Sequence, residues 1–520
     1  MLLQRFQIET FSRLCFVTLG TIYFLSQLLF FFGFSLNTFT SVGIVIVAII
    51  LSNLFIKNKK LIYPTLFIVL TFILFVIINL YIDFTWDGQA YHQEMAIRMA
   101  EGWNPITTKQ DAIWVYHYPK AFETLGAFFY MIFGTIKAVK IPNLFIFLLL
   151  FLYSFSYIKK YYSKVESLGI SVIIAFNPIL LCQLTSNLVD GFLYAICIIL
   201  VLSYLNLKKN KRYLIDFFLA LIILVNIKYT GVVFACAIIG YVGFYELFIK
   251  KNRAIVKKIV IASIAMIPFL YTPYIKNNLI ENNHVFYPLM GENKIDFAEN
   301  YVPEIIKPYN RFERIILANF TTISNRGEGE FKIPFTFSMK ELQRYRNGGP
   351  RNGILGVWWS GLLLISLLYY FFNLIKLRKE FAFSHFEMII LCILFFTFIN
   401  KAGWWYRYTP FIWLIPLFLT LSIKRYKKSR LFEYNFLFIA IVNGLLTLSI
   451  SFGAKYIDTK RFEDNLQKLA SKSYRIDFGD FYGNKILLKE YDIKYIESDK
   501  STFKNPISLN SEVILEIQDE

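Results

Sequence analysis

Long apolar runs alternate with short charged segments over most of this chain. Many of the runs approach the roughly 20 residues that a helix needs to cross the hydrocarbon core of a bilayer. The pattern therefore predicts an all-α polytopic membrane protein with about thirteen transmembrane helices. The predicted spans are 11–33, 38–56, 61–82, 141–157, 168–184, 191–207, 213–225, 231–249, 259–275, 354–375, 386–398, 408–423 and 436–452.

The amino-acid composition supports this class of protein. Hydrophobic residues make up 56% of the 520 residues and aromatic residues 19%, with a mean hydropathy of +0.49. A single soluble core cannot hide so much apolar surface. The formal net charge of +19 is scattered between the apolar runs. A nucleic-acid-binding protein would gather such charges on one soluble face, so we expect membrane lipids and no nucleic acid as partners.

The basic clusters predict how the chain is oriented in the cell membrane. Lysine and arginine in short loops mark the cytoplasmic side. The clusters that can all face inward together are Arg5 with Arg13, 57–60, 159–164, 208–212, 250–258, 376–379 and 424–430. This places the N-terminus in the cytoplasm and the C-terminus outside it. Only one crossing then separates the first external loop from Lys159, so the shorter apolar helix 122–134 is predicted to lie at the outer interface without crossing.

Every segment large enough to form a site is then external: the loops 83–120 and 276–352 and the tail 454–520. We take residues 1–453 as the transmembrane domain. The tail changes composition sharply and predicts a small mixed α/β domain on the outer face. Its predicted elements are a charged helix at 459–471 and strand-like runs at 485–491, 493–497 and 513–517.

No cytosolic segment is long enough for a nucleotide-binding domain. Neither GxGxxG nor GxxxxGK[ST] follows a strand and opens a helix. An enzyme acting on the outer face must then use another kind of activated substrate, for which a membrane-borne lipid is the natural candidate. The five cysteines all lie in apolar runs, so we expect no disulfide in the external segments.

The stretch WDGQAYHQ places Asp87 directly after the apolar run 61–82, where a span meets water. The pattern predicts a helix over 88–101 with Gly102 at its end and Asp87 at its N-cap. Capping keeps a carboxylate ionised, as a proton acceptor must be, so a cap and a catalytic base are compatible readings of Asp87. Tyr91 and His92 are the better candidates for a cleft, whereas Glu94 and Arg98 are favoured as a surface ion pair.

Two further segments carry aromatic or basic residues suited to binding. His117 and Lys120 lie in WVYHYPK, just before the helix 122–134. Aromatic residues at a headgroup boundary are usually anchors, but they also suit sugar faces and lipid phosphates, so both roles stay open. The run RYRNGGPRNG, 344–353, combines glycines and arginines and is either a phosphate-binding loop or a mobile connection.

Three more charges stand where spans should end on the outer side: Asp190 in SNLVDGF, Lys228 in NIKYTG and Arg407 in WWYRYTP. Ionisable groups at this depth are costly unless they are paired or face water, and are therefore functional candidates. Their alternative role is snorkelling to the interface. Function is favoured for the two cations, because they run against the inward bias of positive charge.

The order of these elements resembles the GT-C class of integral-membrane glycosyltransferases. The resemblance covers about 61–275 and, weakly, 404–417. It rests on WDGQAY, HYPKAFETLGAFFY, the later Asp190, KYTG and RYTPFIWLIP. Two features depart from the class pattern. The first acidic residue follows the third predicted span and not the first, and Gly88 follows Asp87 where the class often has a second acidic residue.

The resemblance implies transfer of a hexosyl or pentosyl group from a polyprenyl-phosphate donor to a glycan, lipid or protein acceptor. Asp87 would act as general base, and Asp190 would orient the acceptor or tune Asp87. The implied substrate-binding residues are Tyr91, His92, His117, Lys120, Lys228 and Arg407. Of these, Lys228 and Arg407 would stabilise the phosphate. No cofactor is required. A Mg or Mn ion held by Asp87, Asp190 and a histidine is the less favoured alternative.

Two other functions remain as alternatives. A polymerase of lipid-linked oligosaccharide repeat units would use the same face of the membrane and a large external loop. A transporter or lipid flippase is less favoured, because such proteins place charges inside spans and usually repeat their halves. The charges here stay near span ends, and the chain shows no internal repeat.

Overall fold

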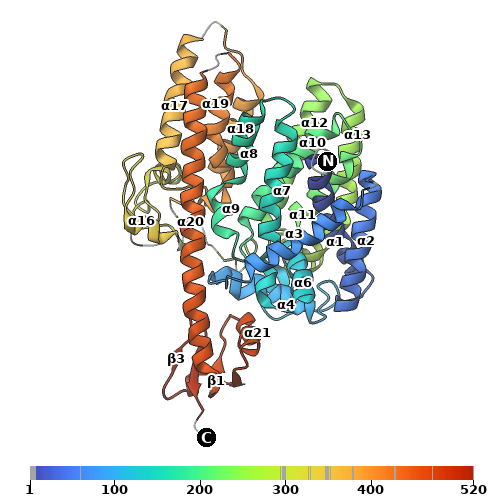
Figure 1. The fold of residues 1–520 in the computed structure, drawn as a ribbon, viewed down its shortest axis with the longest axis vertical. Coiled ribbons are helices and arrows are strands. Elements are labelled where there is room, and N and C mark those ends of the chain that lie inside the picture. Colours follow the sequence, from blue (N-terminus) through green and yellow to red (C-terminus); the bar gives the residue numbers. More distant parts are fainter. Residues whose placement is uncertain are drawn as a thin grey trace.

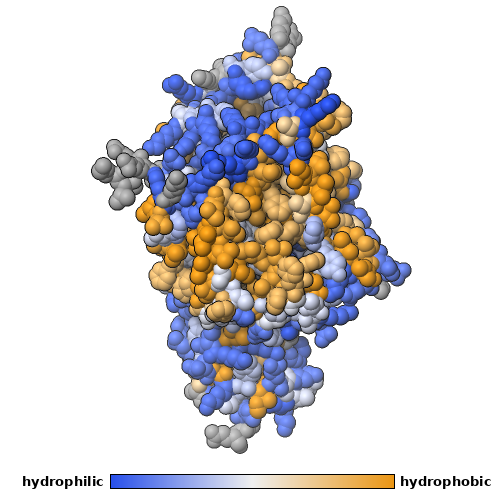
Figure 2. All heavy atoms as spheres, turned by 90° about the vertical axis from the view of Figure 1, so that its right-hand side faces the viewer, coloured by the Kyte–Doolittle hydropathy of each residue, from blue (hydrophilic) through white to orange (hydrophobic). Residues whose placement is uncertain are grey.

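The computed structural model describes residues 7–518 except 59, 293, 296–299, 326, 328, 346–350, 352, 378–379, 427–428 and 471. The chain forms a mostly helical body with a small sheet at one end, which is carried by the longest helix (Figure 1). The face in Figure 2 shows an apolar band between two hydrophilic ends. This arrangement is typical of a protein that spans a membrane.

Within the described residues, eight helical segments are long and apolar enough to cross a membrane. They are α1 (Ile8–Phe31), α2 (Thr38–Ile56), Ile136–Ile158 with α7 (Ile141–Ile158), α10 (Asp190–Leu207), Tyr229–Ile249 with α12 (Tyr229–Phe244), Arg253–Ile280 with α13 (Arg253–Met266), α17 (Trp359–Lys376) and α20 (Arg430–Leu469). Shorter apolar helices are α3 (Ile62–Ile78), α6 (Ala121–Phe133), α11 (Tyr213–Val225), α18 (His385–Ile399) and Pro410–Lys424, which contains α19 (Ile415–Lys424). The described residues thus support a membrane protein with eight candidate spans, and the predicted count of thirteen is not confirmed.

The predicted span 168–184 is broken in the structure. It forms α8 (Lys164–Ala175) and α9 (Pro178–Gln183), which are separated at Asn177. Proline lacks a backbone N–H and disfavours the helical conformation in the residue before it. Asn177 accordingly has φ −55° and ψ 119°, and its side chain accepts a hydrogen bond from the backbone N–H of Ile179. The Asn-Pro pair therefore ends one helix and starts the next.

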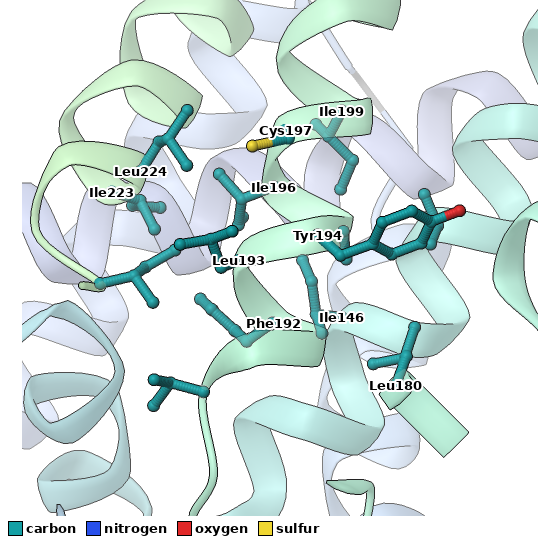
Figure 3. Close-up of a cluster of buried hydrophobic side chains, with 14 of the residues drawn as sticks. Ile146, Leu180, Phe192, Leu193, Tyr194, Ile196, Cys197, Ile199, Ile223 and Leu224 are labelled. Carbon is teal, nitrogen blue, oxygen red and sulfur yellow. The ribbon is translucent and has the colours of Figure 1, made fainter. Parts of the chain in front are cut away.

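The core of the helical body is built around α10, which packs on α7, α9 and α11. Figure 3 shows part of this core, where Leu193, Ile196 and Cys197 of α10 lie beside Ile223 and Leu224 of α11. These side chains are almost completely buried. By contrast, α2, α3 and α12 expose many large apolar side chains, including Ile46, Ile68 and Phe72, as expected of surfaces that face lipid.

The loop 83–120, predicted to be external, folds into short helices that cover one end of the body. A π-helical turn, Gly88–His92, leads into α4 (Gln93–Ala100), and α5 (Ile113–His117) follows. The predicted helix 88–101 is confirmed apart from its last residue, and Gly102 adopts a φ of +98° just beyond it. α6 then packs against α4. The second external loop contains α15 (Arg311–Leu317) and α16 (Met339–Arg344).

The C-terminal domain is a four-stranded sheet with one helix, α21 (Gly483–Glu490). Strand order is β2-β1-β4-β3, with β1 parallel to β2 and antiparallel to β4, and β3 antiparallel to β4. The strands are β1 (Ser473–Asp477), β2 (Lys494–Glu497), β3 (Ile507–Ser508) and β4 (Ile514–Ile517). The predicted strands 493–497 and 513–517 match β2 and β4. The predicted strand 485–491 is wrong, because residues 485–490 belong to helix α21. The adjacent Leu487 and Leu488 are both buried, whereas adjacent side chains of a half-buried strand point to opposite faces.

The C-terminal domain is joined to the helical body without a linker and docks on its end. Helix α20 runs unbroken for 40 residues across position 453. The domain contacts segments on both sides of α6, because Tyr482 donates to Glu101 at 3.0 Å and the backbone N–H of Ile136 donates to Glu490 at 2.7 Å. The sheet domain therefore docks on the end of α4 and on the turn that follows α6.

Candidate functional site

Four charged side chains from four separate segments form a continuous series of ion pairs, which we call the charge chain. Nη2 of Arg407 donates to Oδ2 of Asp87 at 2.8 Å, and its Nε donates to Oδ2 of Asp190 at 2.9 Å. Nζ of Lys228 donates to the other oxygen of Asp190, Oδ1, at 2.6 Å. The two carboxylates and two cations balance in charge, which lowers the cost of burying them together.

The charge chain forms where helices begin and turn at one end of the core. Asp190 is the first residue of α10, Lys228 lies in the turn between α11 and α12, and Arg407 lies in the 3₁₀ turn Tyr406–Tyr408. Asp87 directly precedes the turn Gly88–His92. The sequence thus brings together residues as much as 320 positions apart.

The break between α8 and α9 helps to hold this arrangement. Nε2 of Gln183, the last residue of α9, donates to Asp190 at 2.9 Å, while its Oε1 accepts from the backbone N–H of Gly191 at 2.8 Å. Asn177, at the break, donates to the carbonyl of Pro410 at 2.9 Å. Both the Asp190 segment and the Arg407 segment are therefore tied to α9.

The burial of the charge chain is uneven. The side chains of Asp190, Arg407 and Lys228 are only 1, 8 and 9% exposed, whereas that of Asp87 is 29% exposed. The ring of Tyr408 lies beside the charge chain, with its centroid 4.1 Å from Nζ of Lys228. Of the four residues of the charge chain, Asp87 is thus the one that solvent or a ligand reaches most readily.

Asp87 does not cap a helix, contrary to the sequence-based prediction. It stands at the N-cap position but already has helical angles, φ −55° and ψ −39°, and its side chain makes no capping hydrogen bond. The carboxylate is instead turned toward Arg407. Asp83 makes the local hydrogen bonds: it accepts from the backbone N–H of Thr85 at 2.9 Å and from that of Asn187 at 2.6 Å. Helix capping, the structural role considered for Asp87, is therefore not its role in the structure.

The two predicted binding histidines and Lys120 are built into the packing of the first loop. His92 is buried and bonded to Glu123, and His117 is bonded through Nδ1 to Asn278 at 2.8 Å. Burial lowers the pKa of His117. Lys120 donates to the carbonyls of Tyr116 and Tyr118 at 3.0 and 2.6 Å, and burial lowers its pKa to about 7. None of the three joins the charge chain.

A cleft of about 830 Å³ lies between the loop 83–120 and the C-terminal domain. Its loop wall contributes Trp86, Tyr91 and Trp114, and its domain wall contributes Phe478 and Tyr482. Polar lining residues are Glu94, Arg98, Asp477, Asp480, Lys485, Glu497, Ser498 and Asp499. The domain wall was not among the predicted site residues. The change of composition after residue 454 indicates a separate small domain, but it does not show which face of that domain docks on the helical body.

Tyr91 connects the cleft to the charge chain. It lines the cleft, and its pKa is raised well above the ordinary value, first by burial and then by the negative charge of the nearby Asp87. Glu94 and Arg98 form the predicted ion pair at 2.6 Å, but this pair belongs to the cleft wall. Burial raises the pKa of Glu94 despite its partner. The cleft therefore presents aromatic faces and paired charges beside Asp87.

Two other predictions bear on this region. The central part of the run 344–353, at residues 346–350 and 352, lies outside the described residues. Among the residues that are described, no three His, Cys, Asp or Glu side chains are grouped so as to hold a metal ion. His92 and His117 are both bonded to other partners, and Arg407 lies between the two aspartates.

Comparison with protein-family models, with curated proteins and with solved structures finds no match to this chain.

Proposed function

We propose that this protein is a membrane glycosyltransferase that moves a sugar from a polyprenyl-phosphate donor to an acceptor on the outer face of the cell membrane. The charge chain is the observation that carries the proposal. It buries two cations and one carboxylate and leaves a second carboxylate, Asp87, 29% exposed and next in the chain to Trp86, which lines the aromatic cleft. A transfer with a phosphate leaving group needs both a base and fixed positive charge.

In this reaction Asp87 takes the proton of the acceptor hydroxyl as that oxygen attacks the anomeric carbon of the donor sugar. The bond from the anomeric carbon to the phosphate oxygen breaks, and polyprenyl phosphate leaves with the electron pair. Arg407 and Lys228 stabilise the charge that develops on this oxygen. Arg407 uses Nε and Nη2 for the two aspartates, and a guanidinium has five N–H donors, so it retains others for a phosphate.

The cleft supports a sugar acceptor. Trp86 and Trp114 offer flat apolar rings, and Asp480 and Ser498 offer hydrogen-bonding groups on the opposite wall. Aromatic surfaces with a few polar groups that fix orientation are typical of sites for small organic ligands. Trp86 precedes Asp87 in the chain and Tyr91 lies near its charge, so we propose that an acceptor held against these rings presents a hydroxyl to the base.

Replacement of the base tests the proposal. Membranes containing the wild-type chain should transfer sugar from polyprenyl-phosphate donors, and the Asp87→Asn variant should lose most of this activity at equal amounts of folded protein. Removal of a general base typically lowers a rate about 10²- to 10⁴-fold. Asp111→Asn is the matched control, because Asp111 is an exposed aspartate of the same loop. Full activity of Asp87→Asn would exclude Asp87 as the base.

The size of the cleft favours one alternative, a polymerase of lipid-linked repeat units. A volume of about 830 Å³ is near the upper end of ordinary ligand pockets, so the cleft has room for more than one sugar residue. The mass of the product separates the two functions. A gain of one sugar supports the transferase, and a gain of a whole oligosaccharide repeat supports the polymerase.

A further inference from the structure

One segment of the second external loop has its polarity reversed relative to an ordinary soluble loop. Between residues 331 and 339, every second side chain is large and apolar and points outward. The exposed fractions are 50% for Phe331, 74% for Ile333, 40% for Phe335, 52% for Phe337 and 69% for Met339. The segment is not extended: it turns at 334–335, where Phe335 has a φ of +65°, and Met339 opens α16. Single exposed apolar residues are common on proteins, but five large ones within nine residues mark a surface for another apolar phase.

The one charged side chain within 331–339, Lys332, points inward, whereas the flanking Glu330 and Lys340 are exposed. Nζ of Lys332 donates to both carboxylate oxygens of Glu341, at 2.7 and 2.8 Å, and these side chains are only 4 and 1% exposed. In water, a loop gains nothing by burying this ion pair while it exposes three phenylalanines, because burying an ion pair costs desolvation. The reversed polarity is that of a surface surrounded by hydrocarbon.

The segment is held against the ends of two apolar helices. The ring of Phe335 lies on Gly361, in the first turn of α17, where an added Cβ would be 2.5 Å from the ring. Phe312 of α15, itself 58% exposed, packs on Phe398 near the end of α18, with ring centroids 5.8 Å apart. In Figure 1, α16 accordingly lies beside the lower end of α17.

The outward row also continues an apolar surface of α17. Beyond Gly361 this helix exposes Leu364, Leu368, Phe371, Phe372 and Ile375. Because α17 is a candidate span, that surface faces acyl chains. The segment adjoins it at the end of the helix that is nearer the C-terminal domain (Figure 1). The same lipid that covers α17 therefore reaches the row of Phe331, Ile333, Phe337 and Met339.

We propose that residues 331–339, with the adjacent Phe312, insert into the outer leaflet of the membrane and bind its acyl chains. The inserted segment anchors the second external loop at the membrane surface. The inference does not depend on the proposed glycosyltransferase activity.

Reagent access in a bilayer tests this insertion. Ile333→Cys is compared with Ile496→Cys, which is 57% exposed on β2 of the C-terminal domain. Both changes are made in a chain in which Cys236 and Cys392, the natural cysteines that are not buried, are alanine. The proteins are reconstituted in phosphatidylcholine vesicles and treated with a charged, membrane-impermeant maleimide. Labelling is expected to be at least about tenfold slower at position 333, because burial of an isoleucine side chain in hydrocarbon shifts an equilibrium by that much or more.

A second readout identifies what covers the segment. A bimane attached at position 333 should be quenched by lipids brominated on their acyl chains, and a bimane at position 496 should not. Met339→Cys serves as a second inserted position if Ile333→Cys fails to fold, as judged by gel filtration. Equal labelling rates at 333 and 496 would overturn the proposal. Slow labelling without quenching by brominated lipid would also overturn it, since the segment would then be covered by protein, including a second copy of this chain.

Discussion

At the scale of single residues, Arg407 is the centre of the candidate site, because it is the one residue of the charge chain that contacts both aspartates. Without it, Asp190 keeps Lys228 and Gln183 as partners, but Asp87 loses the cation to which it is bonded. Removing one partner of a buried ion pair leaves an uncompensated charge, and this costs far more than removing a pair from the surface. The side chain thus has both a structural and a proposed chemical role.

Arg407→Met should therefore destabilise the protein strongly. Breaking a buried pair of this kind costs about 3–5 kcal/mol. Lys109→Met is the matched control, because Lys109 pairs with Glu281 at the surface, where its side chain is 71% exposed, and an exposed pair contributes about 1 kcal/mol or less. Thermal unfolding in detergent should show a clearly larger fall in apparent Tm for Arg407→Met. Equal falls would show that the charge chain contributes no more to stability than a surface pair does.

Lys120 gives a prediction for the pH dependence of stability. Burial lowers its pKa to about 7 in the folded protein, from an ordinary value of 10.5. Between these two values the unfolded chain holds a proton that the folded chain has released, so the contribution of Lys120 to stability rises with pH. The apparent Tm of the wild type relative to Lys120→Met should therefore increase from pH 6 to pH 9.

The control for this comparison is Lys109→Met in the same loop, where the side chain is 71% exposed. Its difference from the wild type should stay constant over the same pH range. A constant difference for Lys120→Met as well would mean that the buried lysine keeps its proton on folding.

At the scale of elements, the turn between α11 and α12 positions Lys228 through a close backbone contact. A Cβ on Gly231 would lie 2.0 Å from the carbonyl oxygen of Leu224, which belongs to the preceding helix. Backbone at such a distance cannot give way as a flexible side chain can. The glycine therefore lets the two helices approach, and Lys228 lies in the turn between them.

Gly231→Ala should consequently separate α11 from α12 and destabilise the protein, since overpacking of this kind costs about 1–3 kcal/mol. The matched control is Gly240→Ala in the same helix, where nothing lies within 4 Å of the added Cβ. That change should be neutral or stabilising by about 1 kcal/mol or less, because alanine favours a helix over glycine. The comparison is made by thermal unfolding, and a tolerated Gly231→Ala would show that this turn adjusts freely.

The elements that could be predicted from sequence are those that local pattern determines. The apolar runs of α1, α2, α7 and α10 were predicted within a few residues, because a span must satisfy its backbone hydrogen bonds internally and be apolar over its length. The break at Asn177 followed an Asn-Pro signal that hydropathy alone does not weigh. The partner of Asp87 could not be predicted, because the local capping signal is independent of an arginine 320 residues away.

At the scale of the whole molecule, α20 joins the apolar body to the C-terminal domain, and the cleft lies where the two meet (Figure 1). A common apolar cluster also crosses this junction, with Ile82 and Ile136 on one side and Leu466 and Leu488 on the other. Shared burial of this kind makes the domain part of the fold and not an appendage. The cleft, Asp87 and the sheet should therefore lie on one side of the membrane.

The side on which they lie determines what the site can use as a substrate. Positive charges in short loops predict that 208–212, at the far end of α10 from Asp190, is cytoplasmic and that the sheet is outside. In intact cells, an impermeant maleimide should label Lys489→Cys on α21 of the C-terminal domain at once and Lys211→Cys only after permeabilisation, both positions being exposed. The reverse result would put Asp87 and the cleft in the cytoplasm, where nucleotide-activated sugars are within reach. The case for a lipid-linked donor would then fail, even if Asp87→Asn abolished transfer.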